Sequence, residues 1–192
     1  MRVLDLDDAA AIDAAEDGLR AGEAIVVPTD TVYGLAALPS AVETLYTLKG
    51  RPESVPIAVL VESLEQAASV VVMSGAASRL AHAFWPGPLT IVASGADGAG
   101  TTGVRCPDHT FLRVLAGRVG PLAVTSANRH GEATPPDARG AAASLAGDVA
   151  LVIDGGPCSG VASTVVDVTS PQLAIIRAGP ITEEQIRAAA LR

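Results

Sequence analysis

The chain has 192 residues, of which 49% are hydrophobic, 18% charged and 3% aromatic, which excludes a disordered protein and predicts a core of Val, Leu, Ile and Ala. Its formal net charge of −8 argues against a general nucleic-acid-binding protein, because affinity for the phosphate backbone comes mainly from Lys and Arg. No apolar run approaches the roughly 20 residues that span a bilayer, and the N-terminus does not resemble a signal peptide. Since the two cysteines form neither a metal-type cluster nor a disulfide framework, we expect a cytoplasmic protein with reduced thiols.

Helices and strands alternate through the first part of the chain, and strands follow one another more closely near its end. In chain order, periodicity and turn residues predict a helix between Asp8 and Gly22, a strand over 24–27, a helix over 41–48, a strand over 57–61, helices over 63–70 and 74–84, strands over 89–93 and 101–106, a helix over 111–115, a strand over 122–124, a helix over 138–145, strands over 149–153, 163–168 and 173–176, and a helix over 182–191. This pattern favours a single mixed α/β domain over residues 1–192, with a twisted open sheet flanked by helices.

The stretch IVVPTDTVYGL, residues 25–35, reads as a buried strand that runs into a polar loop. Open α/β sheets usually place their ligands at such strand ends. Residues 29–33 bring three hydroxyls and one carboxylate together, and Gly34 is expected to let the backbone turn sharply.

Lys49 follows this loop and is the only lysine among the 13 basic residues of the chain. In a chain that otherwise uses Arg, a lone Lys suggests a site that requires a compact, mobile point charge. Taken by itself, this observation is equally consistent with a chance surface lysine on a helix. The neighbouring Arg51 and the prolines that follow it shift the balance towards an anion-binding loop.

Five loops share one pattern, an apolar segment that ends in small hydroxyl, amide or cationic residues. They are residues 29–33, 49–51, 101–105, 125–128 and 163–164, and Arg177 follows the last strand. If these loops converge, one cleft receives Lys49, Arg51, Arg105 and Arg177, which suits a polyanion such as a nucleoside triphosphate. Taken singly, the Ser and Thr residues are better explained as caps of turns.

Several other classes of site have no support in the sequence. It contains neither a P-loop nor the glycine fingerprint of dinucleotide-binding proteins. Three scattered histidines give no metal-ligand spacing, and no Ser-His-Asp or Cys-His arrangement can be argued from spacing. Arg105 could lower the pKa of Cys106, but a buried structural thiol is the preferred interpretation. Spacing therefore supports neither a protein-bound metal site nor a catalytic triad.

Seven motifs occur in a fixed order along the chain. They are PTDTVYGL at 28–35, KGRP at 49–52, WPGPLT at 85–90, GVRCP at 103–107, TSAN at 125–128, DGGPCSGVASTVVD at 154–167 and IIRAG at 175–179. Each motif is weak alone, but all seven in register make a strong signal. From about residue 8 onward, the chain resembles the YrdC-like threonylcarbamoyl-AMP synthases, which supply the first step of threonylcarbamoyladenosine modification of tRNA.

The resemblance implies a nucleotidyltransferase that joins L-threonine, bicarbonate and ATP into threonylcarbamoyl-AMP and releases pyrophosphate. By motif position, threonine would be held by Thr31, Arg105, Ser126 and Ser163, and ATP by Lys49, Arg51, Thr101, Asn128 and Arg177. Lys49 and Arg51 would act as catalytic cations, because negative charge grows on the leaving pyrophosphate. Mg²⁺ would be held mainly by the nucleotide phosphates. The product would then pass to a separate threonylcarbamoyl transferase complex.

The chain departs from the family pattern at a few positions. Val55 stands where a polar, nucleotide-contacting residue is common, and Leu60 where some members carry a threonine-contacting His. His130 and Pro136 replace a usual Ser and a usual Thr. These changes concern fine substrate contacts and leave the main cations in place. The chain is also expected to lack the extra C-terminal domain of longer relatives.

Two alternatives belong to other functional classes. A non-catalytic module could cradle tRNA or double-stranded RNA on the concave basic surface of the family, although acidity and few aromatics weigh against it. A transient RNA contact remains compatible with the enzyme. A domain of a carbamoyl-transferring maturation factor would normally bring zinc-finger cysteines, which two isolated Cys residues cannot supply.

Overall fold

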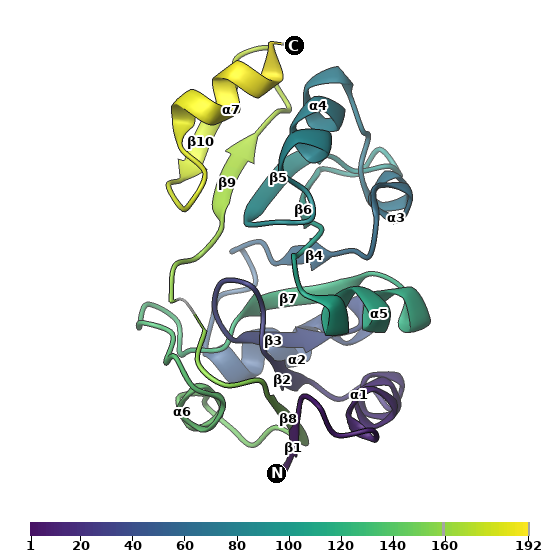
Figure 1. The fold of residues 1–192 in the computed structure, drawn as a ribbon, viewed down its shortest axis with the longest axis vertical. Helices are drawn as coiled ribbons and strands as arrows, with labels where there is room; N and C mark the ends of the chain where they lie inside the picture. The colour runs from purple at the N-terminus through teal and green to yellow at the C-terminus, as the bar shows by residue number, and fades with distance from the viewer. Residues whose placement is uncertain (159, 192) are drawn as a thin grey trace.

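The computed structural model describes residues 1–158 and 160–191, so Ser159 of the sixth motif and Arg192 lie outside the described residues. Across these ranges the chain forms one ten-stranded mixed sheet with helices packed on it (Figure 1). The strands are β1 (Arg2–Asp5), β2 (Ile25–Val27), β3 (Gly34–Ala37), β4 (Ala58–Leu60), β5 (Leu89–Ser94), β6 (Thr101–Arg105), β7 (Leu122–Ser126), β8 (Leu151–Asp154), β9 (Thr164–Asp167) and β10 (Ala174–Arg177). The helices are α1 (Ala11–Arg20), η1 (Pro39–Ala41), α2 (Val42–Lys49), α3 (Leu64–Val70), α4 (Gly75–Phe84), α5 (Thr110–Val119), α6 (Ala138–Ala143) and α7 (Glu183–Ala190). The predicted mixed α/β class with an open sheet is confirmed.

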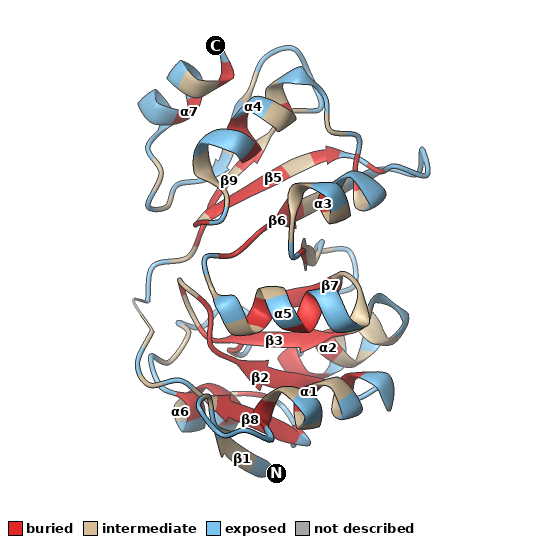
Figure 2. Cartoon of the chain, turned by 45° about the vertical axis from the view of Figure 1, so that its right-hand side comes forward, coloured by how far each residue is buried: buried red, intermediate tan, exposed pale blue. Residues whose placement is uncertain are grey.

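The strands lie in the order β1-β8-β2-β3-β7-β4-β6-β5-β9-β10. In the first half of this order, from β1 to β7, neighbouring strand residues belong to two different cores. Leu35 packs in one core with residues of α2 and α6, whereas Ala36 packs in another with residues of α1 and α5. Helices therefore cover both faces of this half, and its central strands are buried throughout (Figure 2).

The second half, from β4 to β10, is built differently. Ile91 and Val166 pack against α4 and α7, and Val104 packs against α3. The residues that alternate with them point to the opposite face, as pleated strands require. This opposite face carries the cavity that is described in the next section.

Two strands were not predicted from the sequence. β1 pairs in parallel with β8, and β3 lies antiparallel between β2 and β7. The expected sharp turn at Gly34 is wrong, because Gly34 opens β3 and is not among the glycines with positive φ. A Cβ atom at this position would lie 2.9 Å from Cγ1 of Val124, so the glycine permits the close packing of β3 on β7.

Helix ends follow the predicted capping residues. The Ser63 side chain accepts a hydrogen bond from the Gln66 amide at the start of α3, and Thr182 and Gln185 form a reciprocal capping box at the start of α7. Gly50 ends α2 in the left-handed conformation, which a glycine adopts without strain. Among the described helices, none has the length and apolarity that a membrane crossing requires.

Candidate active site

A cavity of about 620 Å³ lies on the open face of the second half of the sheet. Alternate residues of four neighbouring strands line it, as the period-two geometry of a strand dictates. These strand residues are Ala58 and Leu60 of β4, Thr90 and Val92 of β5, Thr101, Gly103 and Arg105 of β6, and Val165 and Asp167 of β9. Loop residues from 29–32, 51–57 and 162–163 close its sides, together with Gly34 of β3, residues 124–126 of β7 and residues 176–177 of β10. The volume is in the usual range for a small-molecule site.

Three of the four predicted cations line this cavity together: Arg51, Arg105 and Arg177. They come from the loop after α2, the end of β6 and the end of β10, so the fold unites distant parts of the sequence. Arg105 is buried, Arg51 is partly buried and Arg177 remains exposed on one side, and desolvation lowers the pKa of each guanidinium. The predicted convergence of loops therefore holds for the arginines, within a chain whose formal charge is −8.

Arg105 is the most deeply buried of these cations, with 5% of its surface exposed. Its Nε donates to the carbonyl of Gly87 at 3.0 Å and its Nη1 to Oγ1 of Thr31 at 3.0 Å. Its Nη2 forms an ion pair with Oδ1 of Asp30 at 2.5 Å. Three of the five N–H groups of the guanidinium are thus committed to the protein, and each terminal nitrogen keeps one for a ligand.

Arg177 is held by Ser163, which lies at the entrance to β9. The Nε and Nη2 atoms of Arg177 donate to the carbonyl and the hydroxyl of Ser163, both at 3.0 Å. The same hydroxyl lies 2.9 Å from Oγ1 of Thr90. Burial is the main cause that lowers the pKa of Arg177, and the positive charge of Arg105 lowers this pKa further. The two arginines line the same cavity.

Arg51 closes the cavity on the side of β7. Its Nη1 donates to Oγ1 of Thr125 at 3.0 Å and its Nη2 to the carbonyl of Pro56 at 2.7 Å. Its Nε is buried and has no hydrogen-bond partner within the described ranges. A buried N–H that lacks an acceptor is costly, so this donor is suited to an acceptor on a bound ligand.

Lys49 is the exception among the predicted cations, because it lies behind the cavity and is not among its lining residues. It is 2% exposed, and its Nζ donates to the carbonyls of Ser126 and Asn128 at 2.5 and 2.7 Å. Burial, and secondarily the charge of Arg51, lower the pKa of Lys49 from 10.5 to about 8. The lone lysine therefore ties the end of α2 to the TSAN loop in this conformation, and the alternative of a chance surface lysine is wrong.

The remaining predicted residues divide in the same way. Thr31, Thr101, Ser126 and Ser163 line the cavity, but Asn128 does not. The amide nitrogen of Asn128 donates to the carbonyls of residues 129 and 132, and its Oδ1 accepts from Lys49 at 3.0 Å. In this structure Asn128 shapes the TSAN loop behind the cavity.

Comparison with known proteins places the chain in a family. Residues 17–179 match the model of the Sua5/YciO/YrdC family, which carries the description "Telomere recombination". The chain belongs to the Sua5/YciO/YrdC family. A Mycobacterium tuberculosis protein provisionally named threonylcarbamoyl-AMP synthase is 39% identical over 186 residues, which cover 90% of this chain and 86% of that protein.

Two further relatives of the family are longer than this chain. The threonylcarbamoyl-AMP synthase of Bacillus subtilis is 36% identical over 185 residues, covering 88% of this chain and 54% of the relative. Pyrococcus abyssi Sua5, whose crystal structure was solved in complex with L-threonine, is 32% identical in sequence to this chain. The two structures superpose with a TM-score of 0.92, and the match covers 98% of this chain and 61% of Sua5. The chain thus spans little more than half the length of these two family members.

Several cavity residues of this family member were not predicted as site residues. Thr90 lies in the WPGPLT motif and Gly103 in GVRCP, and both line the cavity, as does Asp167. Side chains alternate between the two faces of a strand, and these residues lie on the same face of the sheet as Arg105. This alternation could have identified them as site residues. Asp30 pairs with Arg105 from outside the lining, and no periodic pattern could reveal that contact.

The departures from the family pattern also have definite places. Val55 and Leu60 line the cavity, whereas His130 and Pro136 do not. Cys106 is 3% exposed, donates its thiol to the Glu62 carbonyl, and has a pKa that burial raises, so its interpretation as a structural thiol is confirmed.

Proposed function

We propose that this chain is an L-threonylcarbamoyladenylate synthase, which forms threonylcarbamoyl-AMP and pyrophosphate from L-threonine, bicarbonate and ATP. One observation carries the proposal: three arginines and a set of hydroxyls line a single cavity in a chain of net charge −8. Such a concentration of cations in a cleft favours a polyanionic substrate. The names of the relatives agree with it, and Pyrococcus abyssi Sua5 was solved with L-threonine.

Threonine is proposed to bind beside Arg105. The two N–H groups that the terminal nitrogens of Arg105 retain can pair with a carboxylate, which matches the planar fork of a guanidinium. Thr31, Ser126 and Ser163 line the same cavity and offer hydroxyls to the rest of the amino acid. Leu60 adds an apolar contact on this side.

ATP is proposed to lie between Arg51 and Arg177, with Thr101 on the floor of the cavity. The threonine amine would attack the carboxyl carbon of bicarbonate, forming a carbamate and releasing water. A carbamate oxygen would then attack the α-phosphorus, and the bond to pyrophosphate would break. Arg51 and Arg177 would stabilise the charge that develops on the pyrophosphate. Lys49 would support this step by holding the TSAN loop.

Mg²⁺ would enter with the triphosphate and neutralise part of its charge. Within the described ranges no group of three or more His, Cys, Asp or Glu side chains could hold a metal ion. In this proposal the ion is bound mainly by phosphate oxygens of the nucleotide. Transfer of the product to a separate transferase complex and a cytoplasmic location stay predictions.

The alternative of a non-catalytic RNA-binding module is not favoured. The three arginines face a cavity, and each is engaged by protein acceptors, whereas RNA backbones are bound by extended basic surfaces.

The proposal is tested by pyrophosphate release from ATP, measured with threonine and bicarbonate present together and with each omitted. We expect release only when both are present. Release that continues at the same rate without threonine or without bicarbonate would refute the assignment. A gel shift with tRNA over a range of salt concentrations tests the alternative, which requires tight binding without nucleotide turnover.

A further inference from the structure

Arg105 is oriented by a carboxylate that lies outside the cavity. We propose that Asp30 is a positioning residue, which fixes the Arg105 guanidinium so that its remaining N–H groups face the carboxylate of the amino-acid substrate. This inference rests on the proposed function of the cavity. Asp30 itself is not among the lining residues, so it acts through Arg105 and does not contact the substrate.

The contact between the two residues is short and shielded from solvent. Oδ1 of Asp30 lies 2.5 Å from Nη2 of Arg105, and the two side chains are 13% and 7% exposed. Charge-assisted hydrogen bonds of this kind are stronger and more directional than neutral ones. The pair therefore sets the direction of the guanidinium plane more firmly than either partner's rotamer preference would.

Asp30 is the only charged group among the three protein acceptors of Arg105 within the described ranges. The other two, the Gly87 carbonyl and the Thr31 hydroxyl, are neutral. Burial lowers the pKa of Arg105, and the charge of Asp30 together with its hydrogen bond opposes that shift. Without Asp30, a buried cation would have neutral acceptors alone and would reorient towards solvent or towards another anion.

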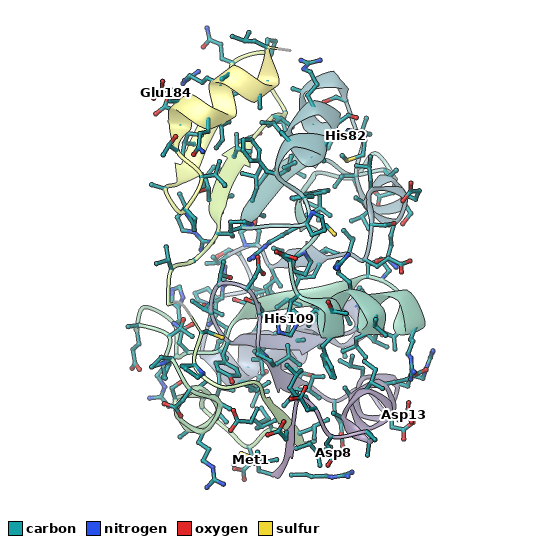
Figure 3. All side chains as sticks on the ribbon, in the orientation of Figure 1. Met1, Asp8, Asp13, His82, His109 and Glu184 are labelled. Atoms are coloured by element: carbon teal, nitrogen blue, oxygen red, sulfur yellow. The ribbon has the colours of Figure 1, made fainter. Side chains whose placement is uncertain are left out.

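His109 lies near Asp30 but does not compete with Arg105 for the Asp30 carboxylate. Oδ2 of Asp30 and Nδ1 of His109 are both buried, and neither has a hydrogen-bond partner in the part of the chain that is described. His109 directly precedes α5 and is partly buried, and it lies near the middle of the view in Figure 3. Burial lowers the pKa of His109 even though Asp30 raises it, so the ring is neutral near pH 7. The imidazole therefore does not compete with the guanidinium as a second cation.

The experiment compares Asp30→Asn with Asp13→Asn. Asparagine keeps the shape of the side chain and removes its charge. Asp13 is the matched control because it also pairs with an arginine, at 2.6 Å from Arg118, but its side chain is 70% exposed and lies at the outer edge of the molecule (Figure 3). Two quantities are measured for each variant: the KM values for threonine and ATP, and the hydrogen-exchange rate of the Arg105 Nε–H by NMR.

We expect Asp30→Asn to raise the KM for threonine about 10- to 100-fold, as loss of a charged hydrogen-bond partner implies, and to change the KM for ATP less than about twofold. The Arg105 Nε–H should exchange at least about tenfold faster, because its bond to Gly87 is no longer held in place. Asp13→Asn should change neither quantity. A merely structural role would reduce folded protein without separating the two KM values.

The proposal requires both changes, so a normal threonine KM or a normal Nε–H exchange rate in Asp30→Asn overturns it. If the wild-type chain shows no threonine-dependent turnover, the proposed function fails, and the exchange rate alone decides whether Asp30 positions Arg105. If Asp30→Asn does not fold, Asp30→Glu takes its place. This substitution keeps the charge but displaces it by one methylene group. The KM for threonine should again rise more than the KM for ATP, but by a smaller factor than in Asp30→Asn.

Discussion

The two halves of the sheet differ in how helices cover their faces, and they have different roles. From β1 to β7, helices cover both faces, and β2 and β3 are buried at every residue (Figure 2). From β4 to β10, helices cover one face, and the other face carries the cavity with its three arginines. The first half supplies stability through apolar packing, and the second half exposes alternate residues to a ligand. Function in this fold therefore depends on which strand face is left without a helix.

The largest effect is expected for Arg105→Ala, which breaks this division. The substitution leaves the Asp30 carboxylate largely buried without its cation. Although Arg105 lines the cavity, its loss should therefore destabilise the fold as much as the loss of a core side chain. We expect the free energy of unfolding to fall by about 3–5 kcal/mol and pyrophosphate release to be lost. Urea unfolding and the turnover assay measure the two effects.

The control for this prediction is Arg118→Ala, because Arg118 forms ion pairs on the surface with 42% of its side chain exposed. Its removal should leave the urea midpoint close to that of the wild type, because exposed ion pairs contribute little to stability. Equal urea midpoints for Arg105→Ala and the wild type would contradict the importance of the Asp30 pair.

A core substitution in the first half should give the opposite pattern, with stability lost and catalysis kept. Leu19 lies in α1, is 0% exposed and belongs to the core shared with α5. Leu19→Ala should lower the free energy of unfolding by about 2–5 kcal/mol, since it removes buried methyl groups and leaves a cavity. The KM values of the folded fraction should stay at the wild-type level.

Leu191→Ala is the matched control, because this leucine is 88% exposed. It should be nearly neutral in the same unfolding experiment. A changed threonine KM in Leu19→Ala would show that the two halves are not energetically separable.

Lys49 lies within the first half, where it ties the end of α2 to the end of β7 and the residues that follow, and its ionisation should make stability depend on pH. Its pKa is about 8 in the folded chain against 10.5 in the unfolded chain. Between these values the unfolded state binds more protons, so stability rises with pH by at most about 1.4 kcal/mol per unit. This contribution is complete above the unfolded pKa and is lost as the pH falls through the folded pKa.

Lys49→Met should remove this pH dependence. At neutral pH it should also cost about 1–3 kcal/mol, because the carbonyls of Ser126 and Asn128 lose their donor. The measurement compares unfolding free energies of wild type and variant at pH 8 and pH 9.5. Parallel changes in the two proteins would show that Lys49 does not ionise differently on folding.

Much of the fold could be predicted from the sequence, and the elements that were missed were missed for physical reasons. Helices that begin with Ser63 or Thr182 were recognisable because capping is local. β3 was missed because Gly-Leu-Ala-Ala has low strand propensity, and its formation depends on pairing with both β2 and β7.

The site shows the same limit. The three arginines were identified from motif position and strand ends, but whether a cation faces the cavity or lies behind it depends on tertiary packing. Lys49 and Arg51 are two residues apart, yet Nζ of Lys49 turns to the TSAN carbonyls while Arg51 lines the cavity. Likewise, the contact of Asp30 with Arg105 joins residues 75 positions apart. Local sequence carries no record of such contacts.

The smallest effect is expected at Gly103, where the floor of the cavity lacks a side chain. A Cβ atom there would lie 3.3 Å from Cγ2 of Thr90 and 3.7 Å from Cγ2 of Val92, so Gly103→Ala should fit with a stability change below about 1 kcal/mol. The added methyl group occupies space over β6, and the KM for ATP or for threonine should rise a few-fold. Gly18→Ala in α1 is the control, with its new Cβ 3.4 Å from Glu23 and away from the cavity lining. If Gly103→Ala leaves both KM values unchanged, the substrates do not lie against this strand, and the open face of the second half would bind them only through its loops.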